Sequence, residues 1–440
     1  MERSLRINIV AGFLGMFWLA VPLGAPLPLL MQAVDASATQ LGILSASWQI
    51  AMLAQIPAAF LVERMARRKP LWAVTSIAHR MLWAVPAAVP LLYPDQRSQW
   101  PVLIIAALSV SNLLTNLGTA SWQSWMADLV PEKSAGSFWG TRQRFLALAL
   151  MLATGCFGWV LDRFSADGSL LGFQCVFGLC AFFGVSDIVV HLWVREPPPV
   201  RANSVLTIQQ RIRAPFTSRG FQILTGSMML WTTAQSLLGY TIGMPGFFSM
   251  VHLKETFGAS FSQASLIFLF NALGAVLSTP WLGRWMDKAG AAAVMARLLA
   301  FAPISQMGWW FAPYGSFEIA GSSWPRAVVW MLPVSLVQGA VLTGALLCQL
   351  RLTQMTTNTG GRTVAMALHW SLTGIAGAVG ALGAGWLQDH WRSPQSANAS
   401  AWNFDTAFNF LVFASTLLTW FGAFPLMRAL ERRFSKPQIE

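Results

Sequence analysis

Five ionisable residues of this sequence lie inside long apolar segments, where a charge or an unpaired polar group is costly. They fall at three places in the chain: His79 and Arg80, Asp187 and His191, and His369. Ionisable groups in such surroundings are rare, and they commonly serve in binding, in proton transfer or in buried ion pairs. These five are therefore the first candidates for functional chemistry.

The composition indicates that the segments around these residues cross a membrane. Of the 440 residues, 55% are hydrophobic and only 10% are charged, whereas a soluble domain has about 25% charged residues. A chain with so little charge cannot cover its surface with polar groups, and it is too apolar to be disordered. The sequence therefore predicts an integral membrane protein and argues against two or three soluble domains.

The cysteines and the basic character exclude other classes of function. The four cysteines (Cys156, Cys175, Cys180 and Cys348) lie in apolar runs without metal-ligand spacing, so we expect buried thiols and neither a disulfide framework nor a metal site. The net charge of +12 fits basic loops on the cytoplasmic side of a membrane better than nucleic-acid binding. We expect no cofactor.

The apolar runs predict twelve spans, because a membrane-crossing helix needs about 20 mostly apolar residues. The runs are continuously apolar without the alternation of a barrel strand, which favours helices. The first run is too long for a cleavable signal peptide. The expected spans are 8–32, 41–62, 71–93, 101–127, 138–161, 170–194, 221–251, 261–286, 290–313, 325–350, 362–388 and 404–427.

The basic residues give the expected orientation of these spans. If the N-terminus lies inside, most of the 29 Lys and Arg residues fall in inner segments, and only a few fall in outer loops. Because cytoplasmic loops carry the excess of positive charge, both termini are predicted to be cytoplasmic. The protein is expected to be multi-pass and to lie in the cytoplasmic (inner) membrane.

The centre of the chain divides the spans into two sets of six. A long hydrophilic stretch, 195–219, contains Pro197–Pro199 and several arginines, and proline with charge is typical of a linker. We therefore expect a six-helix bundle at 1–194, a basic cytoplasmic linker at 195–219 and a second six-helix bundle at 220–440. Two six-helix halves around a basic loop form a transporter architecture.

A repeated motif supports this division. The second span ends in Ala59, Glu63, Arg64, Ala66, Arg67, Arg68 and Lys69, and the eighth ends in Gly283, Arg284, Asp287, Lys288 and Gly290. Both segments resemble the loop signature G-x-x-x-D-R-x-G-R-K of the major facilitator superfamily, although Ala59, Glu63 and Ala66 depart from it. The stretch from Trp125 to Glu132 resembles the end of the fourth span in bacterial permeases. The resemblance covers nearly the whole chain and implies an all-α fold of twelve transmembrane helices in two halves.

The resemblance implies an inner gate built from the two motif copies. Its expected members are Glu63, Arg64, Arg67, Arg68, Asp128, Asp287 and Lys288. Glu63 is expected near the N-terminal turn of the eleventh span at 361–363, because a helix N-terminus carries partial positive charge, and Arg64 or Arg67 is expected within reach of Asp128. The alternative is ordinary anchoring by solvated charges.

In this family the first, fourth, seventh and tenth spans line the solute pathway. Polar and aromatic residues on these spans are the expected cavity residues, and we predict that Asn112, Asn116 and Gln123 share one helical face. Interhelical hydrogen bonds of about 0.6 kcal/mol each would explain such residues equally well. The candidates are Asn112, Asn116, Trp122 and Gln123 on the fourth span, Trp231, Gln235 and Tyr240 on the seventh, and Gln338 on the tenth.

The resemblance also places the third and sixth spans side by side. At 1.5 Å per residue, Arg80 lies about 14 Å and Asp187 about 10 Å from the predicted inner surface. Two opposite charges at similar depth on neighbouring helices predict an ion pair, because an unpaired charge there costs roughly 3 kcal/mol. We favour a structural contact over a proton relay for this pair, with His79 and His191 as its neighbours.

These features favour a secondary active transporter that moves a small organic solute by alternating access. The chain has no P-loop motif, so ATP is not expected to drive it, and the histidines lack the spacing of an enzyme active site. The polar amides and tryptophans favour a neutral or ring-bearing solute such as a sugar or nucleoside, with proton or sodium as the coupling ion and a monomeric state. Drug or metabolite efflux, and a non-transporting assembly factor or sensor, are the alternatives.

Overall fold

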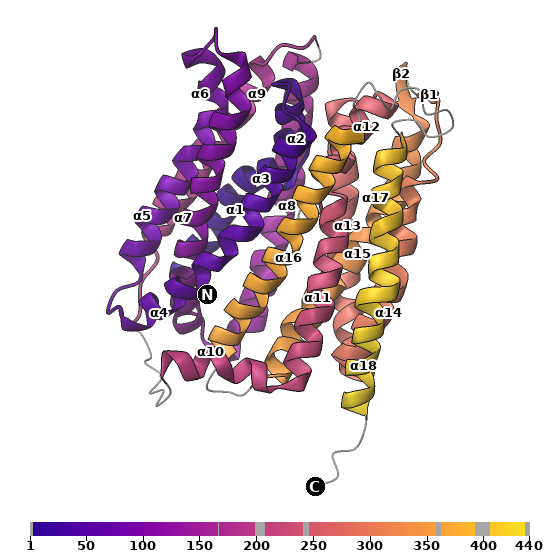
Figure 1. The fold of residues 1–440 in the computed structure, drawn as a ribbon. Helices are drawn as coiled ribbons and strands as arrows, with labels where there is room; N and C mark the ends of the chain where they lie inside the picture. The colour runs from indigo at the N-terminus through magenta and orange to yellow at the C-terminus, as the bar shows by residue number, and fades with distance from the viewer. Residues whose placement is uncertain are drawn as a thin grey trace. The chain divides into compact units, whose positions relative to one another are not determined.

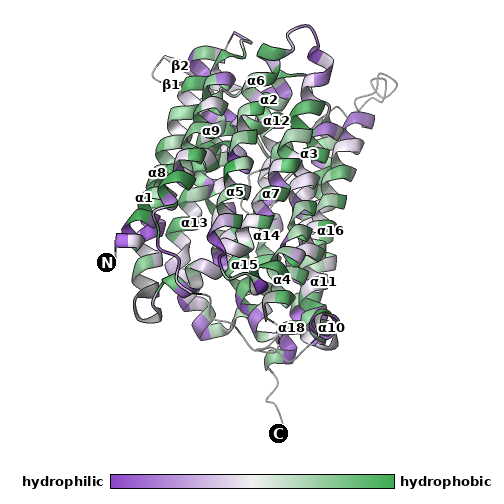
Figure 2. Cartoon of the chain, turned by 90° about the vertical axis from the view of Figure 1, so that its left-hand side faces the viewer, coloured by the Kyte–Doolittle hydropathy of each residue, from purple (hydrophilic) through white to green (hydrophobic). Residues whose placement is uncertain are grey.

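The computed structural model describes residues 3–165, 167–198, 207–240, 246–319, 321–357, 362–391 and 405–435. Long helices make up nearly all of this part of the chain (Figure 1). Ten helical stretches among the described residues are long and apolar enough to cross a membrane. Apolar residues cover most of each helix, and polar residues gather toward the ends (Figure 2). The predicted all-α, multi-span membrane fold is confirmed.

Two of the twelve expected spans are not among these ten, and each of them consists of more than one helix. The stretch expected at 71–93 consists of α5 (Lys69–Met81), a 3-10 turn (Leu82–Ala84) and α6 (Val85–Leu92). Pro86 stands in the first turn of α6, and it lacks the N–H that would continue the hydrogen bonds of α5. The stretch expected at 221–251 consists of α11 (Arg219–Leu237) and α12 (Phe247–Phe257).

Close contacts divide the chain into two compact units. Unit 1 comprises Met1–Ala36, Ala51–Asn203 and Ser260–Ser265, and unit 2 comprises Ser37–Ile50, Ser204–Ala259 and Leu266–Glu440. Unit 1 thus holds most of the first expected half and unit 2 most of the second, while segments 37–50 and 260–265 group with the opposite half. The predicted boundaries at 194 and 219 stay a prediction.

Unit 1 is built around α1 (Arg3–Leu23), which packs against both α8 (Glu132–Ser165) and α9 (Leu171–His191). Helix α5 packs against α7 (Trp100–Leu129) and against α9. Leu5, Trp72, Trp125 and Ile188 belong to the buried apolar cluster of this unit. Its remaining elements are α2 (Pro26–Ala33), two 3-10 turns (Ala51–Ala54 and Arg97–Gln99) and α4 (Gln55–Arg64).

Unit 2 contains one short helix from the first half of the sequence, α3 (Ala38–Ile50), which packs along α16 (Arg362–Trp391). Glycines allow this close approach: a Cβ at Gly42 would lie 2.6 Å from the carbonyl oxygen of Ala381, and one at Gly385 would lie 2.4 Å from that of Ala38. Small residues permit such backbone contact between membrane helices.

The other elements of unit 2 surround α11 and α16, and its buried apolar cluster includes Met228, Met295 and Cys348. Helix α13 starts in the segment assigned to unit 1 and continues into unit 2. These elements are α10 (Ile208–Thr217), α13 (Phe261–Ala289), α14 (Ala291–Gln306), a 3-10 turn (Met307–Trp309), α15 (Arg326–Met355), α17 (Asp405–Leu417), a π-helical turn (Leu418–Ala423) and α18 (Phe424–Ser435).

A short hairpin between α14 and α15 was not expected from the sequence. Strands β1 (Ser316–Ile319) and β2 (Ser322–Pro325) pair in antiparallel fashion, with Ser316 opposite Pro325. Most of its residues are exposed, so the hairpin closes a loop and adds no core. The fold class is unchanged by it.

Each unit contains a carboxylate that caps the start of a helix from the other half of the sequence. In unit 1, Asp162 accepts hydrogen bonds from the amides of Phe261 (2.7 Å) and Ser262 (3.0 Å) at the start of α13. In unit 2, Asp389 accepts them from the amides of Ala38 (2.8 Å) and Thr39 (2.7 Å) at the start of α3. Such caps satisfy amides that have no partner within the helix.

Candidate functional site

Unit 1 contains a partly open cavity of about 420 Å³ between α1, α5, α7, α8 and α9. Tryptophans Trp18, Trp72 and Trp122 form part of its wall. Its ionisable lining residues are His79, Arg80, Arg142, Asp187 and His191. The cavity therefore combines aromatic surface with an unusual concentration of charge for the interior of a helical membrane bundle.

The predicted ion pair between Arg80 and Asp187 is confirmed. An Nη atom of Arg80 lies 3.1 Å from Oδ2 of Asp187, and the two side chains are only 12% and 10% exposed. The Arg80 guanidinium also lies over the ring of Trp18, at 3.4 Å from the ring centre, a geometry that favours a cation–π contact. The ion pair is thus buried, and the Arg80 guanidinium is held by both Asp187 and Trp18.

Two glycines make the room that these charged groups occupy. At Gly15 on α1, a Cβ would lie 2.6 Å from Oδ2 of Asp187, and at Gly184 on α9 a Cβ would lie 2.8 Å from Cδ of Arg80. Helix α1 can therefore pass closely over the carboxylate only because position 15 has no side chain.

Substitution of Gly15 by alanine is expected to destabilise the protein, against the usual trend for helices. Glycine to alanine inside a helix normally stabilises by about 0.5–1 kcal/mol, but a Cβ at position 15 would displace Asp187, and such overpacking costs about 1–3 kcal/mol. Gly155→Ala in α8 is the matched control, because nothing lies within 4 Å of a Cβ there. Thermal unfolding in detergent should show a lower midpoint temperature for Gly15→Ala than for the unsubstituted protein, and an unchanged or higher one for Gly155→Ala. Equal midpoints for the two variants would contradict the packing argument.

His79 is held as a neutral side chain next to the ion pair. Its Nδ1 lies 3.0 Å from the carbonyl oxygen of Ser111, and its Nε2 faces the Arg80 guanidinium at 3.5 Å. Because an arginine nitrogen can only donate, Nε2 must accept and Nδ1 must carry the proton that is donated to Ser111. The hydrogen bonds therefore assign a neutral imidazole.

A second polar chain runs along the cavity through His191. Trp122 Nε1 and Asn8 Nδ2 both donate to His191 Nε2, each at 3.3 Å. Asn8 in turn accepts a hydrogen bond of 2.8 Å from Nε of Arg142. Since both partners of Nε2 are donors, His191 is neutral as well. His191 was expected from the sequence as a candidate, whereas Asn8 and Arg142 were not.

The predicted cavity residues of α7 separate into two groups. Trp122 and Gln123 line the cavity of unit 1, together with Thr115 and Thr119. Asn112 and Asn116 are buried and are not among its lining residues. Instead, Gln55 Nε2 donates to Asn116 Oδ1 at 2.6 Å, and Asn116 Nδ2 donates to the Asn112 carbonyl oxygen at 2.8 Å. These contacts fit the packing alternative, and a pathway role for this pair stays a prediction.

The predicted cavity residues of unit 2 are all buried. Gln235 accepts a hydrogen bond from Gln306, and the Tyr240 hydroxyl accepts one of 3.1 Å from Trp309. The remaining two members of this set are Trp231 and Gln338. Whether they face the polar residues of α7 concerns the arrangement of the two units and stays a prediction.

His369 belongs to a separate polar cluster in unit 2. Gln349 Nε2 lies 2.8 Å from His369 Nε2, and Thr225 Oγ1 lies 2.9 Å from its Nδ1. The amide nitrogen can only donate, so Nε2 accepts and Nδ1 donates to the threonine hydroxyl. The histidine is satisfied by neutral neighbours on α11 and α15, which is the pattern of a structural contact.

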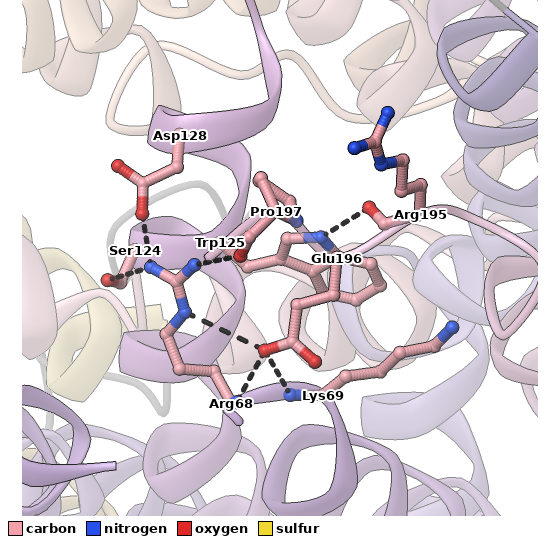
Figure 3. Close-up of polar contacts among 8 residues, drawn as sticks. All are labelled: Arg68, Lys69, Ser124, Trp125, Asp128, Arg195, Glu196 and Pro197. Carbon is pink, nitrogen blue, oxygen red and sulfur yellow. Dashed lines mark hydrogen bonds and ion pairs between the residues drawn. The ribbon is translucent and has the colours of Figure 1, made fainter. Parts of the chain in front are cut away.

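At the predicted cytoplasmic end of unit 1, Arg68 organises a network of polar contacts (Figure 3). Its side chain is 1% exposed. One Nη atom lies 2.5 Å from Oδ2 of Asp128 and 2.9 Å from Oγ of Ser124, and the other donates to the Pro197 carbonyl oxygen at 3.2 Å. The arginine thereby joins the loop before α5, the end of α7 and the chain after α9.

Glu196 completes this network and was not among the residues expected from the sequence. Its carboxylate accepts hydrogen bonds from the backbone amides of Arg68 (2.5 Å) and Lys69 (3.2 Å) at the start of α5. Lys69 Nζ reaches the carbonyl oxygens of Leu192 and Val194 just after α9. Partial burial lowers the pKa of Lys69 from its ordinary value, and the Glu196 carboxylate opposes this change.

The prediction that Arg64 or Arg67 lies within reach of Asp128 was wrong. Arg68 forms the ion pair with Asp128, whereas the side chains of Arg64 and Arg67 are exposed. The chain leaves its helical path after Arg64, which turns Arg68 inward and its neighbours outward. Asp287 and Lys288 of the second motif copy are exposed at the end of α13. The Glu63 side chain and residues 361–363 lie outside what the structure describes in side-chain detail, so their predicted contact is not placed.

Long membrane helices around a polar cavity define the class of a solute transporter. The model of the Major Facilitator Superfamily matches residues 7–381. The chain therefore belongs to the major facilitator superfamily, is a secondary transporter of that family and is not an enzyme, as the motif resemblance predicted.

Solved structures of this superfamily share the fold at low sequence identity. A variant of the nucleoside transporter NupG is 15% identical, with a TM-score of 0.70 over 97% of this chain and 100% of that one. A bacterial homologue of the iron transporter ferroportin is 16% identical, with a TM-score of 0.67 over 98% of each chain. The D-xylose–proton symporter is 14% identical, with a TM-score of 0.63 over 94% of this chain and 96% of that one. No curated protein sequence matches the chain.

Proposed function

We propose that this chain moves a small organic solute across the cytoplasmic membrane by alternating access. The cavity of about 420 Å³ in unit 1 carries the proposal, because it is large enough for a small solute and combines aromatic walls with a few polar groups. The concentration of lysine and arginine in the predicted inner loops supports a cytoplasmic location of both termini.

A pre-formed polar cavity favours a transporter over a non-transporting assembly factor. An assembly factor would have no need of hydroxyl and amide groups such as Thr115, Thr119 and Gln123 on the wall of a cavity. Polar groups on a cavity wall can form hydrogen bonds to a polar ligand. This favours transport over the assembly-factor alternative.

The test is counterflow in proteoliposomes. Vesicles containing the purified protein are loaded with one unlabelled solute and diluted into a trace of the same solute in labelled form, for a panel of sugars, nucleosides and small organic acids. Transient accumulation of label above that of protein-free vesicles is expected for at least one solute, regardless of the direction of transport in the cell. Identical traces for protein and protein-free vesicles across the panel would contradict the proposal.

The same vesicles test the coupling ion and the oligomeric state. An imposed proton or sodium gradient should increase the accumulation of the transported solute if that ion is coupled, and dissipating the gradient should remove the increase. We propose that the protein works as a monomer; a rate per protein that is independent of the protein density in the vesicles is expected.

A further inference from the structure

The guanidinium of Arg142 is the most unusual group in the cavity of unit 1. It projects from α8 into the cavity, and its Nε donates to Asn8. Of the residues that the structure describes, no carboxylate lies within ion-pair distance of Arg142 and only Asn8 accepts a hydrogen bond from its side chain. The two Nη groups, which are the pair of donors that bind carboxylates side by side, therefore have no acceptor among the residues that the structure describes.

The charges around the cavity do not balance. Arg80 and Asp187 neutralise each other in their ion pair. The hydrogen bonds of His79 and His191 assign both as neutral. Arg142 thus leaves one positive charge in excess on the wall of the cavity, where its side chain is partly buried. A partly buried cation without a carboxylate partner is costly, and an anion in the cavity would lower that cost.

The surroundings hold this guanidinium in one place. It lies 5.5 Å and 5.6 Å from the ring centres of Trp122 and Trp139. A Cβ at Gly12 would lie only 3.0 Å from Nη2, so the absence of a side chain there leaves space for the guanidinium. A positioned arginine loses little freedom when it binds a planar anion.

We propose that the cavity binds a small organic acid through its carboxylate, which Arg142 holds with its two Nη groups. A single excess charge favours a monoanion over a phosphate dianion. The aromatic wall and the groups of Thr115, Thr119 and Gln123 suit a planar or hydroxylated body. This inference rests on the proposed transport function, and it differs from the neutral solute that the sequence favoured.

The test compares acids with their uncharged amides in the purified protein. Thermal unfolding in detergent at constant ionic strength is measured with three pairs of nearly equal shape: lactate and lactamide, benzoate and benzamide, and indole-3-acetate and indole-3-acetamide. A ligand that binds only the folded protein raises the unfolding midpoint. At least one acid is expected to raise it clearly more than its amide does. If no acid exceeds its amide, the inference is overturned.

Variants then assign the preference to Arg142. Arg142→Gln should weaken binding of that acid roughly 10- to 100-fold, as expected for loss of charge-assisted hydrogen bonds, and should leave the amide unaffected. Arg142→Lys keeps the charge without the paired donors and should be intermediate. Arg144→Gln is the matched control, because Arg144 lies two residues further along α8 and is exposed. Retention of the acid preference in Arg142→Gln would overturn the proposal.

Failure of this inference can be told apart from failure of the proposed function. Counterflow of a neutral solute without any acid preference would leave transport intact and remove the anion site. Acid binding that depends on Arg142, without counterflow of that acid or of any other solute, would keep the anion site and contradict transport.

Discussion

Arg80→Met and Asp187→Leu are each expected to lower the free energy of unfolding by about 3–5 kcal/mol, and the double variant is expected to lose much less than the sum. Each single substitution leaves the other charge buried without its partner, which is the costly state. The pair is 3.1 Å apart, and both side chains are almost fully enclosed. The double variant replaces the pair by two apolar side chains, which often pack at little cost.

The measurement is a double-mutant cycle read by unfolding in detergent. Arg428 and Glu431 on α18 provide the comparison pair, because this ion pair involves a half-exposed arginine and such pairs couple by only about 0–1 kcal/mol. A coupling energy for Arg80 and Asp187 no larger than that of the exposed pair would contradict a structural role. Full stability of both single variants with loss of solute-driven proton movement would favour the proton relay.

The Arg80–Asp187 contact could be predicted from the sequence because two facts were sufficient. The depth of each residue follows from the helical rise, and the resemblance to the superfamily placed the two spans together. Because the two charges are opposite, an ion pair between them was the arrangement that left neither charge unpaired inside the membrane. The same reasoning predicted the helical fold, since long apolar runs in a membrane can only become helices or barrel strands.

Arg142 shows where this reasoning fails. It stands near the start of an apolar run, where basic residues usually mark the cytoplasmic end of a span, and its position in the sequence therefore favours an inner-loop charge. In the structure α8 begins at Glu132, so Arg142 lies more than two turns into the helix. Its neighbour Arg144 is exposed. Which of two nearby arginines points inward depends on tertiary packing, and no local pattern gives it.

The role of Glu196 was missed for a different reason. It stands in a proline-containing stretch that reads as the start of a linker, and its contact with the start of α5 depends on how the chain turns after α9. The division of the third expected span was foreseeable, since Pro86 interrupts the hydrogen bonding of the run. Hydropathy averages over such breaks and does not register them.

Arg68→Met is expected to destabilise unit 1 by about 3–5 kcal/mol, the cost of leaving a buried ion pair without one partner. The substitution removes the contacts of one side chain to Asp128, Ser124 and the Pro197 carbonyl oxygen at once. Arg68→Lys should lose less, about 1–3 kcal/mol, because an ammonium group cannot reach these acceptors in the fork geometry of a guanidinium. Unfolding in detergent gives both values.

Arg67→Met is the matched control for this prediction, because Arg67 is the adjacent residue, has the same charge and is exposed. Its loss should change stability by no more than about 0.5 kcal/mol. Equal effects of Arg68→Met and Arg67→Met would show that the network does not hold unit 1 together.

The gate hypothesis adds a second readout: Asp128→Asn should alter the labelling of single cysteines placed in the predicted inner vestibule and reduce counterflow more than it reduces stability. Unchanged labelling in Asp128→Asn would limit Arg68 and Asp128 to a structural role, because a gate must change the exposure of the vestibule when its ion pair is weakened.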